Sequence, residues 1–190
     1  TLWNEEGRIQ GHSDSPVSAE GERQLRGLRR AFEGESVEAI YSSDSGRAMR
    51  TAEVIAEATG AQIKPDPRLR ERNYGRLEGR TSAEWRQWRE QHRKPGVEDL
   101  ALAAPGGESA LDRKHRVLAA LEEMLKAAHA EGVVIVTHEG CMFPLLERLL
   151  GPPKEPAQYR VPNASITEVV VEQGGARFVR LGDVRHLAEG

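Results

Sequence analysis

Residues 133–140 read VVIVTHEG, and they join an apolar segment to the first residues of a helix. The run from Val133 to Thr137 is apolar or β-branched throughout, which is typical of a strand covered on both faces of a sheet. A helix is expected to begin at Glu139 or Gly140, because apolar residues recur at helical spacing from there. A buried strand that runs directly into a helix indicates an α/β sheet.

The segments on either side of 133–140 alternate between helical and strand-like patterns. Helical periodicity and capping residues predict helices after Ser18, from Asp44 or Ser45 to Gly60, over 82–93 and over 108–130. In the helix over 108–130 the residues expected to face the core are Leu111, Leu118, Leu121, Leu125 and Ala128. Short apolar segments predict a strand over 37–42 and a closing hairpin over 166–181. The alternation favours a single domain over 1–190, an α/β protein with a three-layer α/β/α sandwich and a mostly parallel central sheet.

Composition excludes several classes of protein. The chain has 190 residues, a length that suits one domain with its own core. Its net charge of −3 gives no general polyanion-binding surface, so we expect no nucleic-acid partner. No apolar run reaches the roughly 18 residues of a membrane span, so no membrane partner is expected. Cys141 is the single cysteine, which excludes an internal disulfide and favours a cytoplasmic location.

His138 stands at the carboxyl end of the strand expected over 133–137, where ligands of open α/β sheets bind. The backbone N–H groups of Glu139, Gly140 and Cys141 are expected to be free there and to form an anion site. The imidazole beside them could donate to a phosphoryl oxygen. A structural histidine bonded to a backbone carbonyl is an equally good interpretation of the position alone.

Two further clusters place charge where a ligand could bind. Arg47 falls in the first turn of a helix, where a cation opposes the helix dipole. It either holds an anion jointly with the helix terminus or is an ordinary exposed arginine. Glu71 stands among arginines in the run LRERNYG, residues 69–75. Burial or a nearby phosphate would suit such a carboxyl for general acid catalysis, whereas the run alone is typical of a solvated segment.

The sequence contains no motif for a metal or a cofactor. His138 and Cys141 stand three residues apart, but no second pair completes a zinc set. There is no glycine-rich phosphate loop and no G-x-S-x-G nucleophile motif. We therefore expect neither a metal nor a cofactor.

Seven segments, in order along the chain, resemble the histidine phosphatase (phosphoglycerate mutase-like) superfamily. They are TLWNEEGRIQGHSDSPVSAEG (1–21), SSDSGRAMRTAE (42–53), LRERNYGRLEG (69–79), APGGES (104–109), VVIVTHEG (133–140), NASITEV (163–169) and LGDVRHL (181–187). The resemblance implies the phosphoglycerate mutase-like fold and a reaction through a phosphohistidine. In that reaction a histidine attacks phosphorus while the leaving oxygen takes a proton, and water or a second substrate then accepts the phosphoryl group.

The resemblance also implies roles for individual residues. Arg47 would clamp the phosphate, Glu71 would be the acid and base, and His138 would stabilise the transferring group. The residues expected to bind substrate are Asn4, Gln10, Gly11, Arg72, Tyr74 and Gly140. Arginines and imidazoles would supply the positive charge that other phosphoryl-transfer enzymes take from magnesium.

Two positions depart from the pattern of this family. Glu139 stands where the family usually has glycine, and a carboxylate there is unfavourable beside a phosphate unless it points away. Thr1 aligns with the residue after the family's Arg-His-Gly-Glu motif, so the resemblance places the nucleophilic histidine and a first strand upstream of Thr1. His12 is not expected to replace that nucleophile, because it lies in a loop where the family carries no catalytic histidine.

Three functions are compatible with these observations. We expect a metal-independent phosphatase that acts on small phosphorylated metabolites, with residues 1–190 inactive on their own. Within enzymes, the alternative is a cofactor-dependent phosphoglycerate mutase. From another class, the alternative is an inactive family member that binds a phosphorylated ligand or partner. The sequence does not decide the oligomeric state and leaves a homodimer open.

Overall fold

The computed structural model describes residues 1–93, 99–127, 132–155, 158–172 and 175–188. The strands are β1 Val37–Ser42, β2 Gln62–Pro65, β3 Gly132–Val136, β4 Ile166–Glu172 and β5 Gly175–Asp183. The helices are α1 Leu2–Glu5, α2 Ala19–Phe32, α3 Gly46–Thr59, α4 Ser82–His92, α5 Ala110–Ala127 and α6 Glu139–Leu150. Short 3-10 helices are η1 Pro67–Leu69, η2 Gly75–Leu77, η3 Asp99–Ala101 and η4 Arg185–Leu187.

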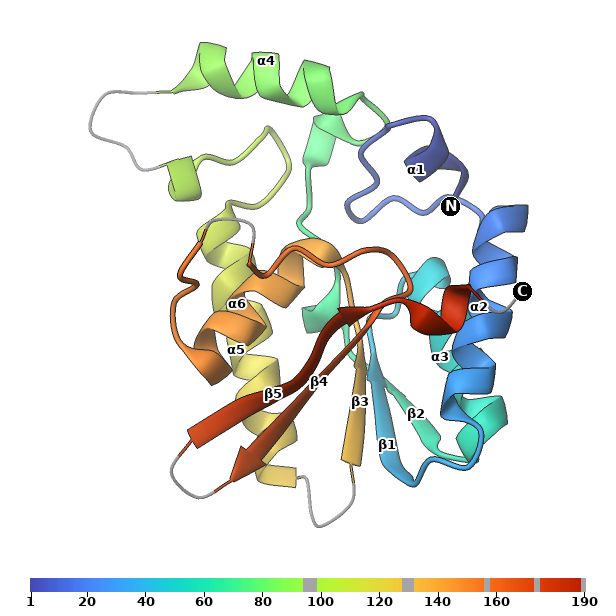
Figure 1. Cartoon of the computed structure of the whole chain (residues 1–190). Helices are drawn as coiled ribbons and strands as arrows, with labels where there is room; N and C mark the ends of the chain where they lie inside the picture. Colours follow the sequence, from blue (N-terminus) through green and yellow to red (C-terminus); the bar gives the residue numbers. More distant parts are fainter. Residues whose placement is uncertain (94–98, 128–131, 156–157, 173–174, 189–190) are drawn as a thin grey trace.

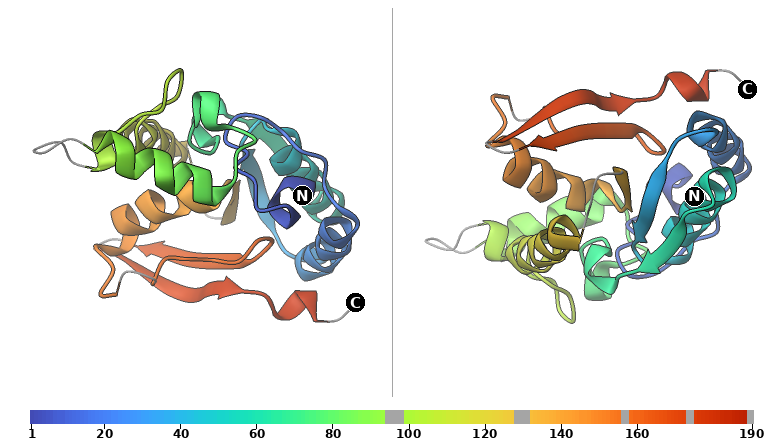
Figure 2. Two further views of the ribbon diagram at one scale, coloured as in Figure 1. Left: turned by 90° about the horizontal axis from the view of Figure 1, so that it is seen from above. Right: turned by 90° about the horizontal axis from the view of Figure 1, so that it is seen from below.

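The parallel sheet is the centre of the fold. β1 lies between β2 and β3, and it is parallel to both. α2 and α3 cover one side of this sheet, and α5 and α6 lie on the other side (Figure 1 and Figure 2). One core cluster joins Leu28 of α2, Ile40 of β1 and Ile55 of α3. A second cluster packs Val117 of α5 against Leu145 of α6. The α/β sandwich expected from the sequence is thereby confirmed.

β4 and β5 form an antiparallel hairpin, as the sequence predicts. In Figure 1 this hairpin lies on the β3 side of the parallel sheet. Among the described residues, β3 is paired with β1 alone and β4 with β5 alone. Each of these two strands therefore has one edge without a strand partner in the part of the chain that the structure describes.

Helix ends lie where local sequence signals predict them. Ser18 caps α2, because its side chain accepts a hydrogen bond from a backbone N–H of the first turn. Ser45 is the N-cap of α3, and Gly60 ends that helix in the left-handed conformation that glycine adopts without strain. Thr81 begins α4 with a capping box that it forms with Glu84. Since none of residues 82–92 is buried, α4 depends on this cap more than on packing in the core.

The packing of α5 corrects two of the predicted core positions. Leu111 and Leu125 are 39% and 38% exposed, whereas the apolar pattern predicts that both face the core. The buried residues of the helix are instead Val117, Ala120, Leu121 and Met124. These four lie at helical spacing on the face toward α6 and η1, while Leu118 is partly buried beside them. Ala128 lies outside the described residues.

Two strands also differ from expectation. Within β3 only Val136 is buried, and Val133, Val134 and Ile135 are half-buried, so the strand is less enclosed than its apolar sequence predicts. β2 is not predicted, because its sequence QIKP is short and mostly polar. It forms at the edge of the sheet through its pairing with β1, a contact that local sequence does not encode.

Candidate active site

The candidate site lies at the carboxyl ends of β1 and β3. Both strands run upward in Figure 1 and end below the loops that carry the polar residues. The N–H of Ser43, just after β1, donates to the carbonyl of Val136 at the end of β3 (2.9 Å). The turn after each strand is therefore held beside the other. This is the edge at which the sequence predicts ligand binding.

His138 is the N-cap of α6, and its ring lies against the turn between β1 and α3. Its Nε2 is 2.9 Å from Oγ of Ser43 and 3.4 Å from Oγ of Ser45. Burial lowers the pKa of His138 to about 3, and the positive charge of Arg47 adds to the effect. The imidazole is therefore neutral at neutral pH, with one ring nitrogen able to donate and the other able to accept.

Arg47 lies in the first turn of α3, as expected, and its side chain is 11% exposed. Its Nη1 donates to the carbonyl of Ser13 (3.0 Å) and to Oδ1 of Asp14 (2.9 Å), and its Nη2 donates to the carbonyl of Gly11 (2.8 Å). The N–H of Gly46 donates to the second oxygen of Asp14. The loop over 11–14 is thus held against the start of α3, and the arginine charge is close enough to act on His138.

Glu71 occupies the N-terminus of α6, which corrects the prediction of a free anion site there. The Oε2 of Glu71 accepts from the N–H of Gly140 (3.0 Å), and its Oε1 accepts from the N–H of Arg72 (2.6 Å). The N–H of Cys141 donates to the carbonyl of His138 (2.9 Å), so it is not free either. The positive end of the helix dipole favours electronegative atoms at this place, and the carboxyl oxygens of Glu71 fill it.

The Glu71 carboxylate is enclosed, because its side chain is only 16% exposed. Nη1 of Arg113, from α5, lies 3.6 Å from Oε1. A Cβ atom at residue 140 would lie 2.3 Å from the same oxygen, so Gly140 is required for this close approach. Glu139, the residue that departs from the family pattern, has an exposed side chain. Because the Glu139 side chain is exposed to solvent, the repulsion expected between its carboxylate and a bound phosphate is reduced.

Gln10 and Asn4 lie next to each other in the N-terminal segment. The Gln10 side chain is buried, and its Nε2 donates to Oδ1 of Asn4 (2.6 Å) and to Oγ1 of Thr1 (2.7 Å). The Gln10 Oε1 is buried and has no hydrogen-bond partner among the residues that the structure describes. The Asn4 residue is exposed, and the bond from Gln10 uses its oxygen and leaves its amide N–H groups unused by that contact.

Arg72 and Tyr74 belong to a polar and aromatic cluster that continues into α4. The Nε of Arg72 donates to the carbonyl of Glu108 (2.9 Å), and its Nη2 donates to the carbonyl of Leu102. The guanidinium lies 5.0 Å from the ring centre of Trp85 and 5.4 Å from that of Tyr74. Burial lowers the pKa of Arg72 and raises the pKa of Tyr74. Glu71 acts on the pKa values of both side chains, so both lie close to it, and Arg72 is buried.

Glu78 is a site residue that the sequence reasoning missed. Its Oε1 accepts from the N–H groups of His12 (2.8 Å) and Tyr74 (3.1 Å). Its Oε2 accepts from the N–H of Ser13 (2.7 Å) and from the Ser13 hydroxyl. A Cβ atom on Gly11 would lie 2.2 Å from Glu78 Oε1, so Gly11 is needed for this contact. Glu78 thus joins the loop over 11–14 to the loop over 73–75. The LEG sequence at 77–79 lies inside a segment that carries the family resemblance, and this was the available signal.

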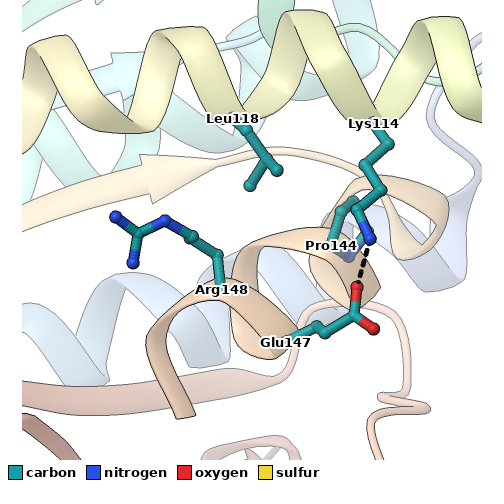
Figure 3. Close-up of a pocket in the computed structure, with 5 residues that line it drawn as sticks. All are labelled: Lys114, Leu118, Pro144, Glu147 and Arg148. Carbon is teal, nitrogen blue, oxygen red and sulfur yellow. Dashed lines mark hydrogen bonds and ion pairs between the residues drawn. The ribbon is translucent and has the colours of Figure 1, made fainter. Parts of the chain in front are cut away.

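A surface groove of about 250 Å³ lies away from these residues, between α5 and α6. It is lined by Lys114, Leu118, Pro144, Glu147 and Arg148 (Figure 3). Nζ of Lys114 donates to Oε2 of Glu147 (2.6 Å) across it. None of the residues expected to be catalytic or to bind substrate lines this groove.

The described residues contain no group of three or more His, Cys, Asp or Glu side chains that could hold a metal ion. They also contain no helix long and apolar enough to cross a membrane.

Comparison with protein families gives a match to the histidine phosphatase superfamily (branch 1) over residues 1–184. A Yersinia enterocolitica protein named probable phosphoglycerate mutase GpmB is 36% identical in an alignment of 197 positions that covers 98% of this chain and 90% of the relative. The protein of that name from Escherichia fergusonii is 38% identical, with the same shares covered.

Solved structures show the same relationship. Bacillus stearothermophilus YhfR matches with a TM-score of 0.84 and 33% identity, covering 98% of this chain and 94% of that one. The mycobacterial glucosyl-3-phosphoglycerate phosphatase in complex with VO3 matches with a TM-score of 0.80 and 30% identity, covering 96% and 94%. The relatives thus include proteins named as a mutase and as a phosphatase.

Proposed function

The chain belongs to the histidine phosphatase superfamily (branch 1), and we propose that within it the protein is a phosphatase of small phosphomonoesters. The main support for this proposal is that His138 lies in the turn between β3 and α6 and that Glu71 is hydrogen-bonded to the first residues of α6. Glu71 is bonded to the N–H of Gly140, two residues after His138. Arg47 acts on His138 from the neighbouring turn. The Glu71 carboxyl, the His138 imidazole and the Arg47 guanidinium are thus connected at one edge of the sheet, which supports the proposal.

The proposed reaction has two steps. A histidine nitrogen attacks phosphorus, the bond from phosphorus to the leaving oxygen breaks, and Glu71 gives that oxygen its proton. Glu71 then takes a proton from water as the water oxygen attacks phosphorus, the bond from phosphorus to the histidine nitrogen breaks, and inorganic phosphate is released. Arg47 and His138 stabilise the negative charge on the transferring group by donated hydrogen bonds. Asn4, Gln10 and Gly11 belong to the N-terminal segment, and their proposed role is to bind the substrate.

The attacking histidine is proposed to lie upstream of Thr1, on a further strand of the sheet. The unpaired edges of β3 and β4 support this, because one strand between them would satisfy both. Intact-mass measurement of the natively expressed protein tests the proposal. A mass of 21.0 kDa, that of residues 1–190 alone, would contradict it.

Hydrolysis is proposed over isomerisation because little chain is available to cover the site. A mutase must exclude water while the phosphohistidine persists, so it needs a lid. Between the segment over 69–79 that carries Glu71 and the Pro-Gly-Gly segment over 105–107, the chain has only residues 80–104, and in the described part of them α4 buries no residue. The run over 72–75 is more mutase-like, which keeps the mutase as the second candidate.

One experiment separates the candidates. The complete protein is given 3-phosphoglycerate with catalytic 2,3-bisphosphoglycerate, and both 2-phosphoglycerate and inorganic phosphate are measured. We expect phosphate release to exceed isomerisation. Isomerisation many-fold faster than release would establish the mutase. If neither product forms from any phosphomonoester while a phosphorylated ligand still binds, the protein is an inactive member that only binds its ligand.

A further inference from the structure

The loop that carries Glu71, here called the acid loop (residues 68–71), is held by its backbone carbonyls. Arg116 of α5 makes most of these contacts. Its Nη1 donates to the carbonyls of Arg68 (2.8 Å) and Arg70 (2.7 Å), and its Nη2 donates to the carbonyl of Glu71 (2.8 Å). The Arg116 side chain is 19% exposed, so these bonds are made with little competition from water.

The other side of the Arg116 guanidinium is fixed by Glu108. Nε of Arg116 donates to Oε2 of Glu108 (3.0 Å), and Nη2 donates to the second carboxylate oxygen. That oxygen also accepts from the N–H of Asn73 (2.9 Å), two residues after Glu71. The pair therefore holds the chain before, at and after the acid. A planar guanidinium can serve these directions together, whereas an ammonium group offers only three donors from a single point.

Residues between the end of β3 and the first turn of α6 make further hydrogen bonds to the acid loop. Oγ1 of Thr137 donates to the carbonyl of Leu69 (2.8 Å), and the Sγ of Cys141 donates to the carbonyl of Arg70 (3.0 Å). The N–H of Gly140 donates to the Glu71 carboxylate itself. Every carbonyl of the acid loop is thus bonded from α5 or from the turn that carries His138. A shift of the loop moves the carboxyl of Glu71 relative to His138.

We propose that Arg116 is a positioning residue for catalysis, because it places the Glu71 carboxyl where it protonates the leaving oxygen. The inference rests on the proposed role of Glu71 as the acid. Arg116 does not touch the reacting atoms. A displacement of about 1 Å in a reacting group can cost on the order of a hundredfold in rate. The loss caused by changing Arg116 should therefore fall on the protonation step.

The test measures kcat in the complete protein for p-nitrophenyl phosphate and for an alkyl phosphate, whose leaving group needs a proton. Arg116→Lys should slow the alkyl phosphate by about a hundredfold and p-nitrophenyl phosphate much less. Glu71→Gln should show the same selectivity, and the double variant should be no slower than Glu71→Gln. The matched control is Arg177→Lys, since the exposed Arg177 side chain pairs with Glu172 on the hairpin of β4 and β5, outside the site. Its two rates should stay as in the unchanged protein.

The outcomes are distinguishable. Equal losses for both substrates in Arg116→Lys, or rate losses that multiply in the double variant, would overturn the positioning role while leaving Glu71 as the acid. Equal losses in Glu71→Gln would overturn the acid itself, and the inference with it. If Arg116→Lys does not fold, Glu108→Gln replaces it. That variant removes the ion pair that orients Arg116, and the same substrate selectivity is expected. Its absence would overturn the inference.

Discussion

Acidification should destabilise the folded protein through His138, well before its carboxylates protonate. In the folded state burial lowers the pKa of His138 to about 3. In the unfolded chain the same side chain has its ordinary pKa of about 6.5. Below pH 6.5 the unfolded chain therefore binds a proton that the folded protein does not. The free energy of unfolding falls as the pH drops from about 6.5 toward 3.

The size of the effect follows from the gap between the two pKa values. Each pH unit below 6.5 stabilises the unfolded chain by about 1.4 kcal/mol, while the folded state gains almost nothing until about pH 4. Between pH 7 and pH 5 this amounts to about 2 kcal/mol. A domain is stable by only about 5–15 kcal/mol in total, so the change is measurable.

Urea unfolding at pH 7 and pH 5 measures the change, in buffers without phosphate because a bound anion would favour the imidazolium form. His138→Asn is the matched variant, since asparagine keeps hydrogen-bonding capacity and does not titrate. The unchanged protein should lose about 2 kcal/mol more than His138→Asn between the two pH values. The same loss in both proteins would refute the reasoning, as would an NMR titration of His138 with a midpoint near pH 6.5.

Three further predictions concern the site. Arg47→Ala should lower kcat/KM by about 10²–10³-fold, and Arg47→Lys should restore only part of it because a point charge cannot bind two oxygens; an unchanged alanine variant would remove Arg47 from the site. Phosphomonoester hydrolysis should survive EDTA, and loss of activity that magnesium restores would contradict the metal-independent reaction. Glu78→Gln should lower the free energy of unfolding by about 2 kcal/mol in urea, since an amide accepts hydrogen bonds through only one of its two ends. The exposed Glu122→Gln is its control and should change stability by less than about 0.5 kcal/mol.

The sequence predicts elements where a local signal is decisive. Ser18 and Gly60 mark helix ends because capping and left-handed backbone depend on the residue itself. The sequence wrongly predicts Leu111 and Leu125 as core residues, because their spacing also matches one face of a helix. The choice between neighbouring faces of α5 is made by α6 and η1, which lie elsewhere in the chain. β2 is missed for the same reason, since its pairing with β1 and not its composition makes it a strand.

The sequence also predicts that Arg47, Glu71 and His138 lie at one edge of the sheet, because the expected strand ends and the family motifs both indicate that edge. It does not find Glu78 or Arg116. Their partners are backbone N–H and carbonyl groups of distant loops, and such groups leave no mark in the identity of a residue. The prediction of free N–H groups at the start of α6 failed similarly, since their occupant comes from the acid loop.

α4 differs from the rest of the site in what a substitution there would cost. The backbone N–H groups at its start are hydrogen-bonded within its own capping box of Thr81 and Glu84, and none of its residues is buried. Its Trp85 nevertheless lies against the guanidinium of Arg72, the residue after Glu71. Exposed positions of a self-capped helix tolerate substitution at little cost in stability. Mutations can therefore accumulate along α4 and alter the surroundings of Arg72 while the sheet and the acid loop stay intact. This arrangement would let a lineage change its preferred substrate without first losing its fold.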